Sequence, residues 1–158
     1  MTKTLVTYFS ASGVTAELAK RLAKAVNADT YEIRPQQPYT DADLNWMDKN
    51  SRSSVEMKDL SCRPAIVQPV PNVQQYDVVF VGFPVWWYRE PSIIDTFMEA
   101  CKWNGQKVIP FATSGTSGIG DSGKNMQRLA PSTTVEAGKR LDANTSESAL
   151  ADWAQKYL

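Results

Sequence analysis

Nearly continuous apolar runs recur along the chain, each short enough to be one strand. Residues 4–9 (TLVTYF), 77–84 (DVVFVGFP) and 107–114 (KVIPFATS) contain few polar side chains. Runs of this kind are typical of parallel strands that are covered on both faces. Weaker runs of β-branched and aromatic residues predict further strands over 29–35 and 132–137.

Segments of helical period lie between these runs. Val14, Leu18, Leu22 and Val26 recur every four residues and predict an amphipathic helix over 13–26. Further helices are predicted by the patterns of residues 91–101, 123–130 and 144–158. In the last of these, an asparagine and a glutamate stand at capping-box spacing, Asn144 and Glu147.

The alternation of strands and helices predicts the fold class. It indicates a three-layer α/β/α sandwich around a five-stranded parallel sheet. The length of 158 residues favours a single domain over 1–158. Pro110 is the awkward position, because a proline inside a central strand cannot donate a hydrogen bond to its neighbour.

One long connection, at about residues 35–75, interrupts the alternation. Residues 41–59 predict a helix of mixed charge that contains Trp46, and the prolines of residues 63–71 predict an extended path. Connections of this length inside a compact domain are often functional. The pattern leaves two alternatives open, a segment that covers a site and an insert that only packs.

Charge and composition exclude several classes of function. Acidic and basic residues balance at 17 each, which argues against a nucleic-acid partner. The chain has no histidine, so Ser-His-Asp catalysis and His-ligated metal sites are excluded, and we expect no metal. Cys62 and Cys101 stand in no metal or phosphatase spacing. Free thiols, and no run long enough to span a membrane, lead us to expect a cytoplasmic protein.

The loop after the first predicted strand, Ser10 to Thr15, has the sequence SASGVT. Its hydroxyls and Gly13 precede a helix, and the N-terminus of a helix can bind phosphate without a side-chain cation. An ordinary helix cap by Ser12 or Thr15 explains the same residues equally well.

Two more loops of unusual composition follow the next predicted strands. In the loop from Pro84 to Pro91, Trp86 and Trp87 are neighbours and cannot both point into one core. We therefore expect at least one of these rings to be exposed, to stack on a planar ligand, or to lie in an interface. The loop at 113–123 is rich in glycine and hydroxyl groups, which suits the polar edge of a flat heteroaromatic ring.

Residues 118–124 (GIGDSGK) fit the glycine and lysine positions of a nucleotide P-loop. Asn125 stands where the P-loop has the Ser or Thr that holds Mg²⁺. The motif also begins several residues after the strand, so we treat it as coincidental.

Taken together, the three loops resemble those of flavodoxin-like FMN proteins. The phosphate loop of that family reads Ser/Thr, any residue, Ser/Thr, Gly, any residue, Thr, and residues 10–15 match it fully. The closest likeness is to short bacterial flavodoxins with PVWWY and TSGTSGIG loops. The resemblance implies FMN as the cofactor and the sheet order 2-1-3-4-5.

The resemblance also implies which residues bind FMN. It assigns the phosphate to Ser10, Ala11, Ser12, Gly13, Val14 and Thr15. It assigns the flanks of the isoalloxazine ring to Pro84, Val85, Trp86, Trp87 and Tyr88. It assigns the pyrimidine edge to Thr113, Ser114, Gly115, Ser117, Gly118 and Gly120.

The implied function is electron transfer or FMN-dependent oxidoreductase activity. The donor would be NAD(P)H or a reductase, and the acceptor, which is unknown, a small molecule such as a quinone. The neutral net charge departs from the acidic surface of carrier flavodoxins and weakens electrostatic docking. A non-catalytic flavodoxin-like interaction module is the alternative, and either a monomer or a homodimer is compatible with the sequence.

Overall fold

A parallel β-sheet with helices on both faces forms the body of the molecule. The computed structural model describes residues 2–114 and 117–158. The strands of the central sheet are β1 (Thr4–Tyr8), β2 (Asp29–Glu32), β3 (Val78–Pro84), β4 (Lys107–Thr113) and β5 (Thr134–Val135). They lie side by side in the order β2-β1-β3-β4-β5, and all of these pairs are parallel. The predicted fold class and the sheet order are confirmed.

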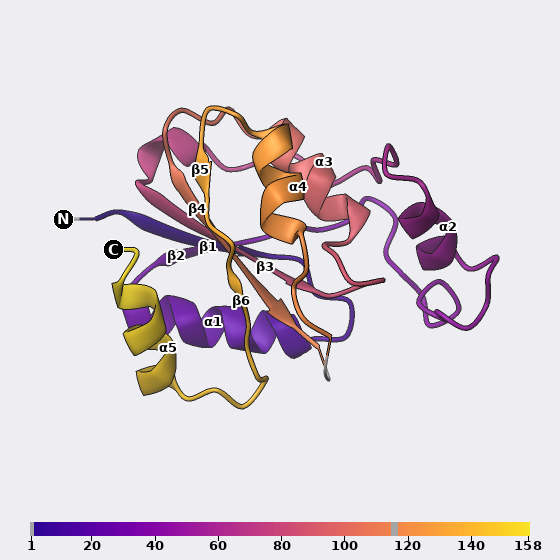
Figure 1. Cartoon of the computed structure of the whole chain (residues 1–158), viewed down its shortest axis with the longest axis horizontal. Helices are drawn as coiled ribbons and strands as arrows, with labels where there is room; N and C mark the ends of the chain where they lie inside the picture. The colour runs from indigo at the N-terminus through magenta and orange to yellow at the C-terminus, as the bar shows by residue number, and fades with distance from the viewer. Residues whose placement is uncertain (1, 115–116) are drawn as a thin grey trace.

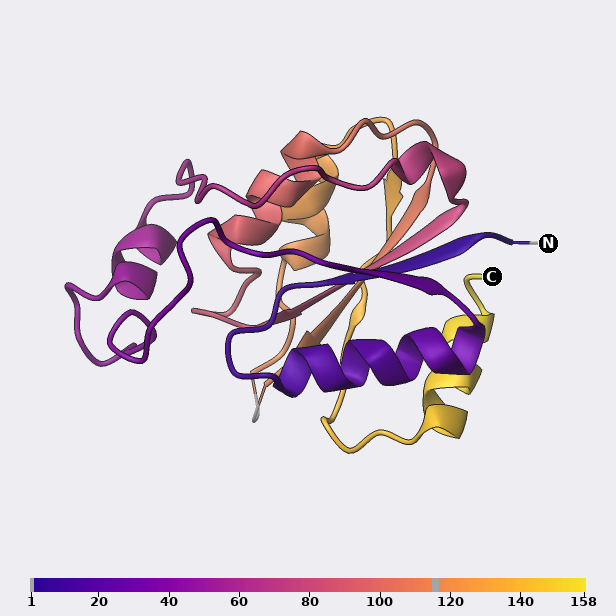
Figure 2. The same ribbon diagram turned by 180° about the vertical axis from the view of Figure 1, so that it is seen from behind.

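The helices form the two outer layers. They are α1 (Val14–Val26), α2 (Arg52–Lys58), α3 (Ser92–Ala100), α4 (Ser122–Leu129) and α5 (Glu147–Gln155), with a short 3-10 helix η1 at Val73–Gln75. Helices α1 and α5 cover one face of the sheet, and α3 and α4 cover the other (Figure 1). The termini lie at the end of the sheet opposite α2 in both ribbon views (Figures 1 and 2).

Alternate residues of each central strand enter different cores, as a period of two requires. In β1, Leu5 packs in the core beneath α3 and α4, while Val6 packs in the core beneath α1 and α5. In β3, Val79 and Phe80 divide between the same two cores. Both faces of the sheet are therefore buried, which explains the nearly unbroken apolar runs.

The edge beside β4 explains how Pro110 is accommodated. The strand predicted over 132–137 is only two residues long, and a second piece, β6 (Lys139–Arg140), pairs with β4 further along. Pro110 lies between these two pairings, where its carbonyl oxygen faces Gly138. A proline lacks only the backbone N–H donor. Between β5 and β6 no edge strand requires a hydrogen bond from that position.

The last helix begins later than its sequence suggested. Ser146, not Asn144, is its N-cap, and the Ser146 Oγ accepts a 3.1 Å hydrogen bond from the Ala149 amide. The Thr145 amide donates instead to the Asp142 carbonyl. This turn keeps Asn144 outside the helix, so the predicted capping box is wrong.

The connection between β2 and β3, residues 33–77 and here called the β2–β3 segment, leaves the body and returns. Residues 34–36, where it leaves, pair with residues 65–67, where it returns, and the Val67 amide lies 2.7 Å from the Arg34 carbonyl oxygen. The predicted helix over 41–59 is wrong in its first half. The side chains of Asn45 and Asp48 accept hydrogen bonds from amides two residues later, and such local bonds compete with a helix.

No helix in the described part of the chain has the length and apolar character that crossing a membrane requires.

Candidate functional site

The three loops predicted as a site meet at the carboxyl ends of β1, β3 and β4. A cleft of about 580 Å³ lies between them and the β2–β3 segment. It is lined by Ala11, Ser12, Leu44, Trp46, Ser53, Pro84, Val85, Trp86, Trp87, Tyr88 and Ser117. A hollow of about 500 Å³ shares five of these residues and adds Val14, Thr113, Ser114 and Ala143. The two spaces form one site at the sheet edge where α/β proteins bind ligands.

The N-terminus of α1 opens into this site without a side-chain cap. Gly13 is the N-cap residue, with φ of 93°, and no side chain bonds to the first helical amides. Ser10 Oγ accepts a 3.0 Å hydrogen bond from the Gly13 amide, which shapes the loop. Neither Ser12 nor Thr15 caps the helix, so the alternative of an ordinary cap is wrong. The free amides and the positive end of the helix dipole remain available to an anion.

Thr15 connects two of the loops. Its side chain is buried, and its hydroxyl lies 2.8 Å from the Thr113 hydroxyl at the end of β4. The Ser114 hydroxyl donates to the Ser117 carbonyl, and Arg140 donates a 3.1 Å hydrogen bond to the Ser114 carbonyl. These contacts hold the end of β4 against the start of α1. Gly115 lies outside the described residues.

The residues after β3 form a tight turn with an unusual backbone. Trp86 and Arg89 exchange two backbone hydrogen bonds of 3.1 and 3.2 Å, and the residues between them, Trp87 and Tyr88, have φ of 49° and 64°. This is a two-residue turn of the kind that normally contains asparagine and glycine. A left-handed conformation costs a residue with a side chain about 1–2 kcal/mol, and such strain is concentrated at functional sites.

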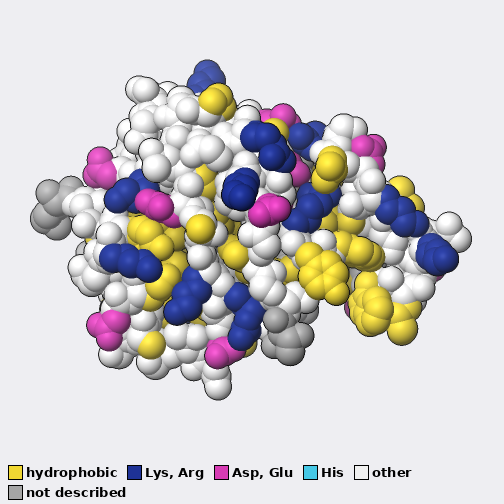
Figure 3. Space-filling model, in the orientation of Figure 1, with side chains coloured by type: hydrophobic (Ala, Val, Ile, Leu, Met, Phe, Trp, Pro, Cys, Tyr) yellow, Lys and Arg dark blue, Asp and Glu magenta, His cyan; other side chains and the backbone are white. Residues whose placement is uncertain are grey.

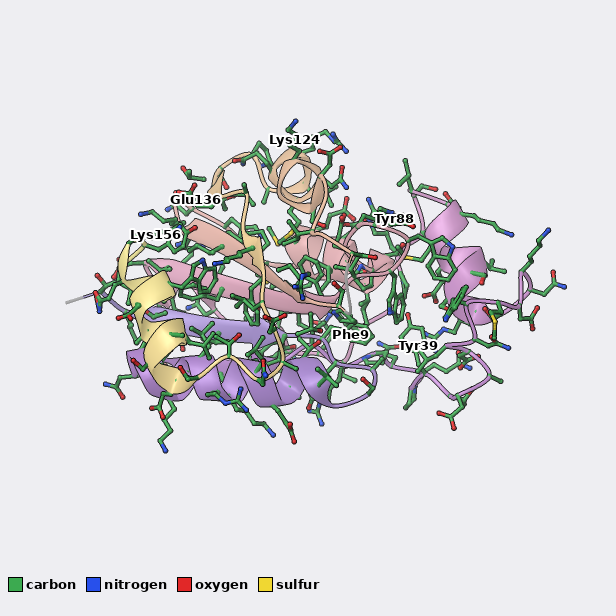
Figure 4. All side chains as sticks on the ribbon, turned by 60° about the horizontal axis from the view of Figure 1, so that its bottom comes forward. Phe9, Tyr39, Tyr88, Lys124, Glu136 and Lys156 are labelled. Carbon is green, nitrogen blue, oxygen red and sulfur yellow. The ribbon has the colours of Figure 1, made fainter. Side chains whose placement is uncertain are left out.

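The aromatic rings of this turn point in different directions, as their adjacency predicts. Trp86 packs edge-on against Phe9 and Tyr39, with ring centroids 5.6 and 5.3 Å away. Trp87 is 41% exposed and Tyr88 is 75% exposed. Figure 4 shows Phe9 and Tyr39 between the sheet and the segment that carries α2, and Tyr88 beside that segment. All three rings line the cleft, and the contacts of Trp86 with Phe9 and Tyr39 anchor the turn.

The glycine-rich loop crosses directly over this turn. A Cβ atom on Gly120 would lie 2.4 Å from the Tyr88 carbonyl oxygen, and the residue has φ of 60°. Glycine is thus required here by contact between two loops. Gly118 is exposed and has open space around it.

A buried charge cluster supports the turn from below. Glu90 and Asp95 are almost fully buried, and Arg89 Nη1 lies 3.8 Å from Glu90 Oε2 and 3.5 Å from Asp95 Oδ2. Asn125 donates a 3.1 Å hydrogen bond to Glu90 Oε1. Burial raises the pKa of Asp95 to about 9, assisted by the hydrogen bond and the charge of Glu90. The Asp95 carboxyl therefore holds its proton at neutral pH.

Sequence reasoning missed four residues that line the site: Leu44, Trp46, Ser53 and Ala143. The first three belong to the β2–β3 segment. The only sign of them in the sequence was a tryptophan, Trp46, within a polar stretch. Ala143 follows β6, a strand that the sequence did not reveal. These positions depend on how distant segments meet.

Two other features remain outside the site. Lys124 of the P-loop-like motif is exposed and lies 4.0 Å from Asp121, and Figure 4 shows it far from Phe9 and Tyr88. A more open hollow of about 480 Å³ lies between α1 and the start of α5. Its Arg21 guanidinium already bonds to the carbonyls of Ala143 and Thr145. None of the three loops reaches that hollow.

Comparison with known proteins supports the resemblance. A family model described as flavodoxin matches residues 3–157. A provisionally named flavoprotein from Bacteroides eggerthii is similar at 47% identity, with a TM-score of 0.92 over 99% of this chain and 98% of that one. Its counterpart from Bacteroides uniformis is 45% identical, with a TM-score of 0.91 over 98% of each chain.

A more distant structure shares the fold. A flavoprotein from Lactobacillus acidophilus, in complex with FMN, has 21% identity and a TM-score of 0.72 over 98% of this chain and 99% of that one. No curated protein matched the chain. Because the family model spans almost all of its residues, this chain belongs to the flavodoxin family.

Proposed function

We propose that the chain binds FMN in this cleft and functions in electron transfer or as an FMN-dependent oxidoreductase. The observation that carries the proposal is the uncapped N-terminus of α1, which opens into a cleft bordered by four aromatic side chains. A phosphate monoester fits the first feature and a planar ring fits the second. The FMN-bound relative supports the same cofactor.

In this proposal the phosphate lies at the start of α1. The backbone of Ser10, Ala11, Ser12, Gly13 and Val14 surrounds it, and the exposed Ser12 hydroxyl donates to it. Thr15 acts indirectly, because its buried hydroxyl bonds to Thr113 and so keeps the loop in place. Binding thus depends on helix amides and needs no side-chain cation.

The ring of FMN then lies along the β3 and β4 loops. Its flanks contact Pro84, Val85, Trp86, Trp87 and Tyr88, and its polar edge contacts Thr113, Ser114, Ser117, Gly118 and Gly120. The turn at 86–89 orients the rings, and the Gly120 contact fixes the distance between the two loops. Contact between Gly115 and the same edge of the ring stays a prediction.

FMN supplies the capacity to accept and donate one or two electrons, and the chain tunes and shields it. No Lys, Arg, Asp or Glu lines the described cleft, so its walls provide neutral contacts. We propose NAD(P)H or a reductase as donor and a small molecule such as a quinone as acceptor. We further propose that residues 1–158 act as one flavodoxin-like domain, while the cytoplasmic location stays a prediction.

The visible spectrum of the purified protein tests FMN binding. We expect absorption of bound flavin, and tight FMN binding by flavin-free protein, with riboflavin binding much more weakly because it lacks the phosphate. A colourless protein that leaves the fluorescence of added FMN unchanged would favour the interaction module instead. Stopped-flow mixing with NADH and NADPH then separates the functions, since reduction by neither favours a carrier that a reductase serves.

A further inference from the structure

The β2–β3 segment is held against the flavin-binding loops at several points. The Arg52 guanidinium stacks on the Tyr39 ring at 3.8 Å, and the Tyr39 ring contacts Trp86. Glu56 accepts hydrogen bonds from both the Tyr39 hydroxyl (2.6 Å) and Arg52 Nε (2.9 Å). These contacts fix the near side of the segment to the 86–89 turn.

The end of α2 is attached to the same turn and to the first residue of α3. Arg89 Nη2 donates to the Met57 carbonyl at 3.4 Å, and the Ser92 hydroxyl donates to the Glu56 carbonyl at 3.3 Å. Unpaired carbonyls at the end of a helix are satisfied by such donors. The segment is thus held in place against the body of the molecule.

The part of the segment that lines the cleft is apolar and uncharged. Leu44, Trp46 and Ser53 line the cleft together with Trp87 and Tyr88, and no Lys, Arg, Asp or Glu is among the described lining residues. Trp46 is 70% exposed. Figure 3 shows hydrophobic side chains gathered on the side of the molecule that carries α2.

Ser53 provides one polar group in this apolar surface. The residue is 2% exposed, and its hydroxyl has no hydrogen-bond partner among the described residues. A buried hydroxyl without a partner is costly, and each case needs an explanation. Because Ser53 lines the cleft, a ligand carbonyl that accepts its proton provides one.

We propose that Leu44, Trp46 and Ser53 form a substrate-binding wall for an uncharged, planar aromatic molecule that carries a carbonyl group. Trp46 covers the flat face of this molecule, Leu44 adds apolar contact, and the Ser53 hydroxyl donates to the carbonyl. The proposal rests on the proposed function, because the FMN ring forms the opposite wall.

The absence of charge among the described lining residues separates this ligand class from two others. A nicotinamide dinucleotide carries a pyrophosphate, which needs cations or a second helix N-terminus, and the wall contains neither. An anionic aromatic acid would leave a charge in an apolar cleft without a partner. A neutral quinone satisfies both the apolar surface and the single donor.

Equilibrium dialysis of the oxidised, FMN-loaded protein tests the proposal. The probe is dimethylnaphthoquinone, methylated at both free carbons of the quinone ring so that it cannot alkylate Cys62. We expect Trp46→Ala to weaken its binding by about tenfold and Ser53→Ala by about fivefold. Val55→Ala on the same segment, exposed and outside the cleft, should change nothing.

Two further probes separate the contributions of the wall. The same quinone carrying a sulfonate should bind at least about tenfold more weakly, because no cation of the wall pairs with it. Dimethylnaphthalene, which has no carbonyl, should be insensitive to Ser53→Ala but sensitive to Trp46→Ala. Equal effects of Ser53→Ala on both neutral probes would overturn the role given to Ser53.

FMN titration of each variant keeps the two proposals apart. We expect Trp46→Ala and Ser53→Ala to bind FMN within about twofold of the parent. Failure of the parent to bind FMN overturns the proposed function. Normal FMN binding with unchanged quinone binding in Trp46→Ala overturns the wall alone. So does a concentration-dependent dimer that Trp46→Ala dissociates, because a second copy would then occupy this surface.

Discussion

The buried pair of Glu90 and Asp95 makes stability depend on pH. Among the described residues, Glu90 Oε2 and Asp95 Oδ1 are buried and have no hydrogen-bond partner. Burial and the neighbouring Glu90 raise the pKa of Asp95 from 3.8 to about 9. Between these pH values the folded chain holds one proton more than the unfolded chain. The contribution of Asp95 to stability is therefore greatest below about pH 4 and is lost as pH rises to about 9.

The size of the effect follows from one proton. The free energy of unfolding should fall by about 1.4 kcal/mol per pH unit, or by about 2.7 kcal/mol between pH 5.5 and 7.5. The chain has no histidine, so almost no other side chain titrates in this interval. This makes the contribution of the pair directly visible.

Asp95→Asn removes the titrating proton and leaves an amide that can donate to Glu90. We expect its free energy of unfolding to be nearly the same at both pH values. Asp121→Asn, at an exposed position, should keep the slope of the parent. Urea unfolding followed by tryptophan fluorescence measures all three proteins, without FMN because a phosphate monoester titrates near pH 6. A parent whose stability does not change with pH, or equal slopes in the parent and Asp95→Asn, would refute the raised pKa of Asp95.

Three further predictions concern the backbone and the phosphate loop. Gly138→Ala should destabilise the chain by about 2–4 kcal/mol, because its Cβ would lie 2.2 Å from the Pro110 carbonyl oxygen. Gly105 has a similar φ but open space around it, so Gly105→Ala should lower the free energy of unfolding by only about 1 kcal/mol. Tyr88→Asn should relieve strain and stabilise by up to about 1 kcal/mol in urea unfolding, whereas Tyr88→Val should destabilise. Ser12→Asp should weaken FMN binding by about tenfold or more in a fluorescence titration, and Ser12→Ala by about threefold, because only the aspartate repels the phosphate.

Much of the fold could be predicted because burial on both faces leaves a direct mark on a strand. Residues 78–84 and 108–112 are apolar since each face meets a helix layer. The loop at 10–15 could be predicted because its family pattern is local. The extent of the helix before Lys58 could not, because hydrogen bonds from Asn45 and Asp48 to nearby amides decide where it begins.

The site shows the same division. The glycines and hydroxyls after β1 and β4 mark a ligand edge without any tertiary information. Leu44, Trp46 and Ser53 join that edge only because Arg52, Tyr39 and Trp86 stack across two segments far apart in sequence. No local pattern encodes such a contact.

The sequence by itself determined the alternation of strands and helices, the three candidate loops and the family, because period, glycine placement and hydroxyl spacing act over a few residues. Tertiary structure alone decided three further features. The edge of the sheet is divided into two short strands beside Pro110. The side chains of Glu90 and Asp95 are buried next to each other. The β2–β3 segment closes one side of the cleft. Each of these features arises because residues far apart in the sequence come into contact only when the chain folds.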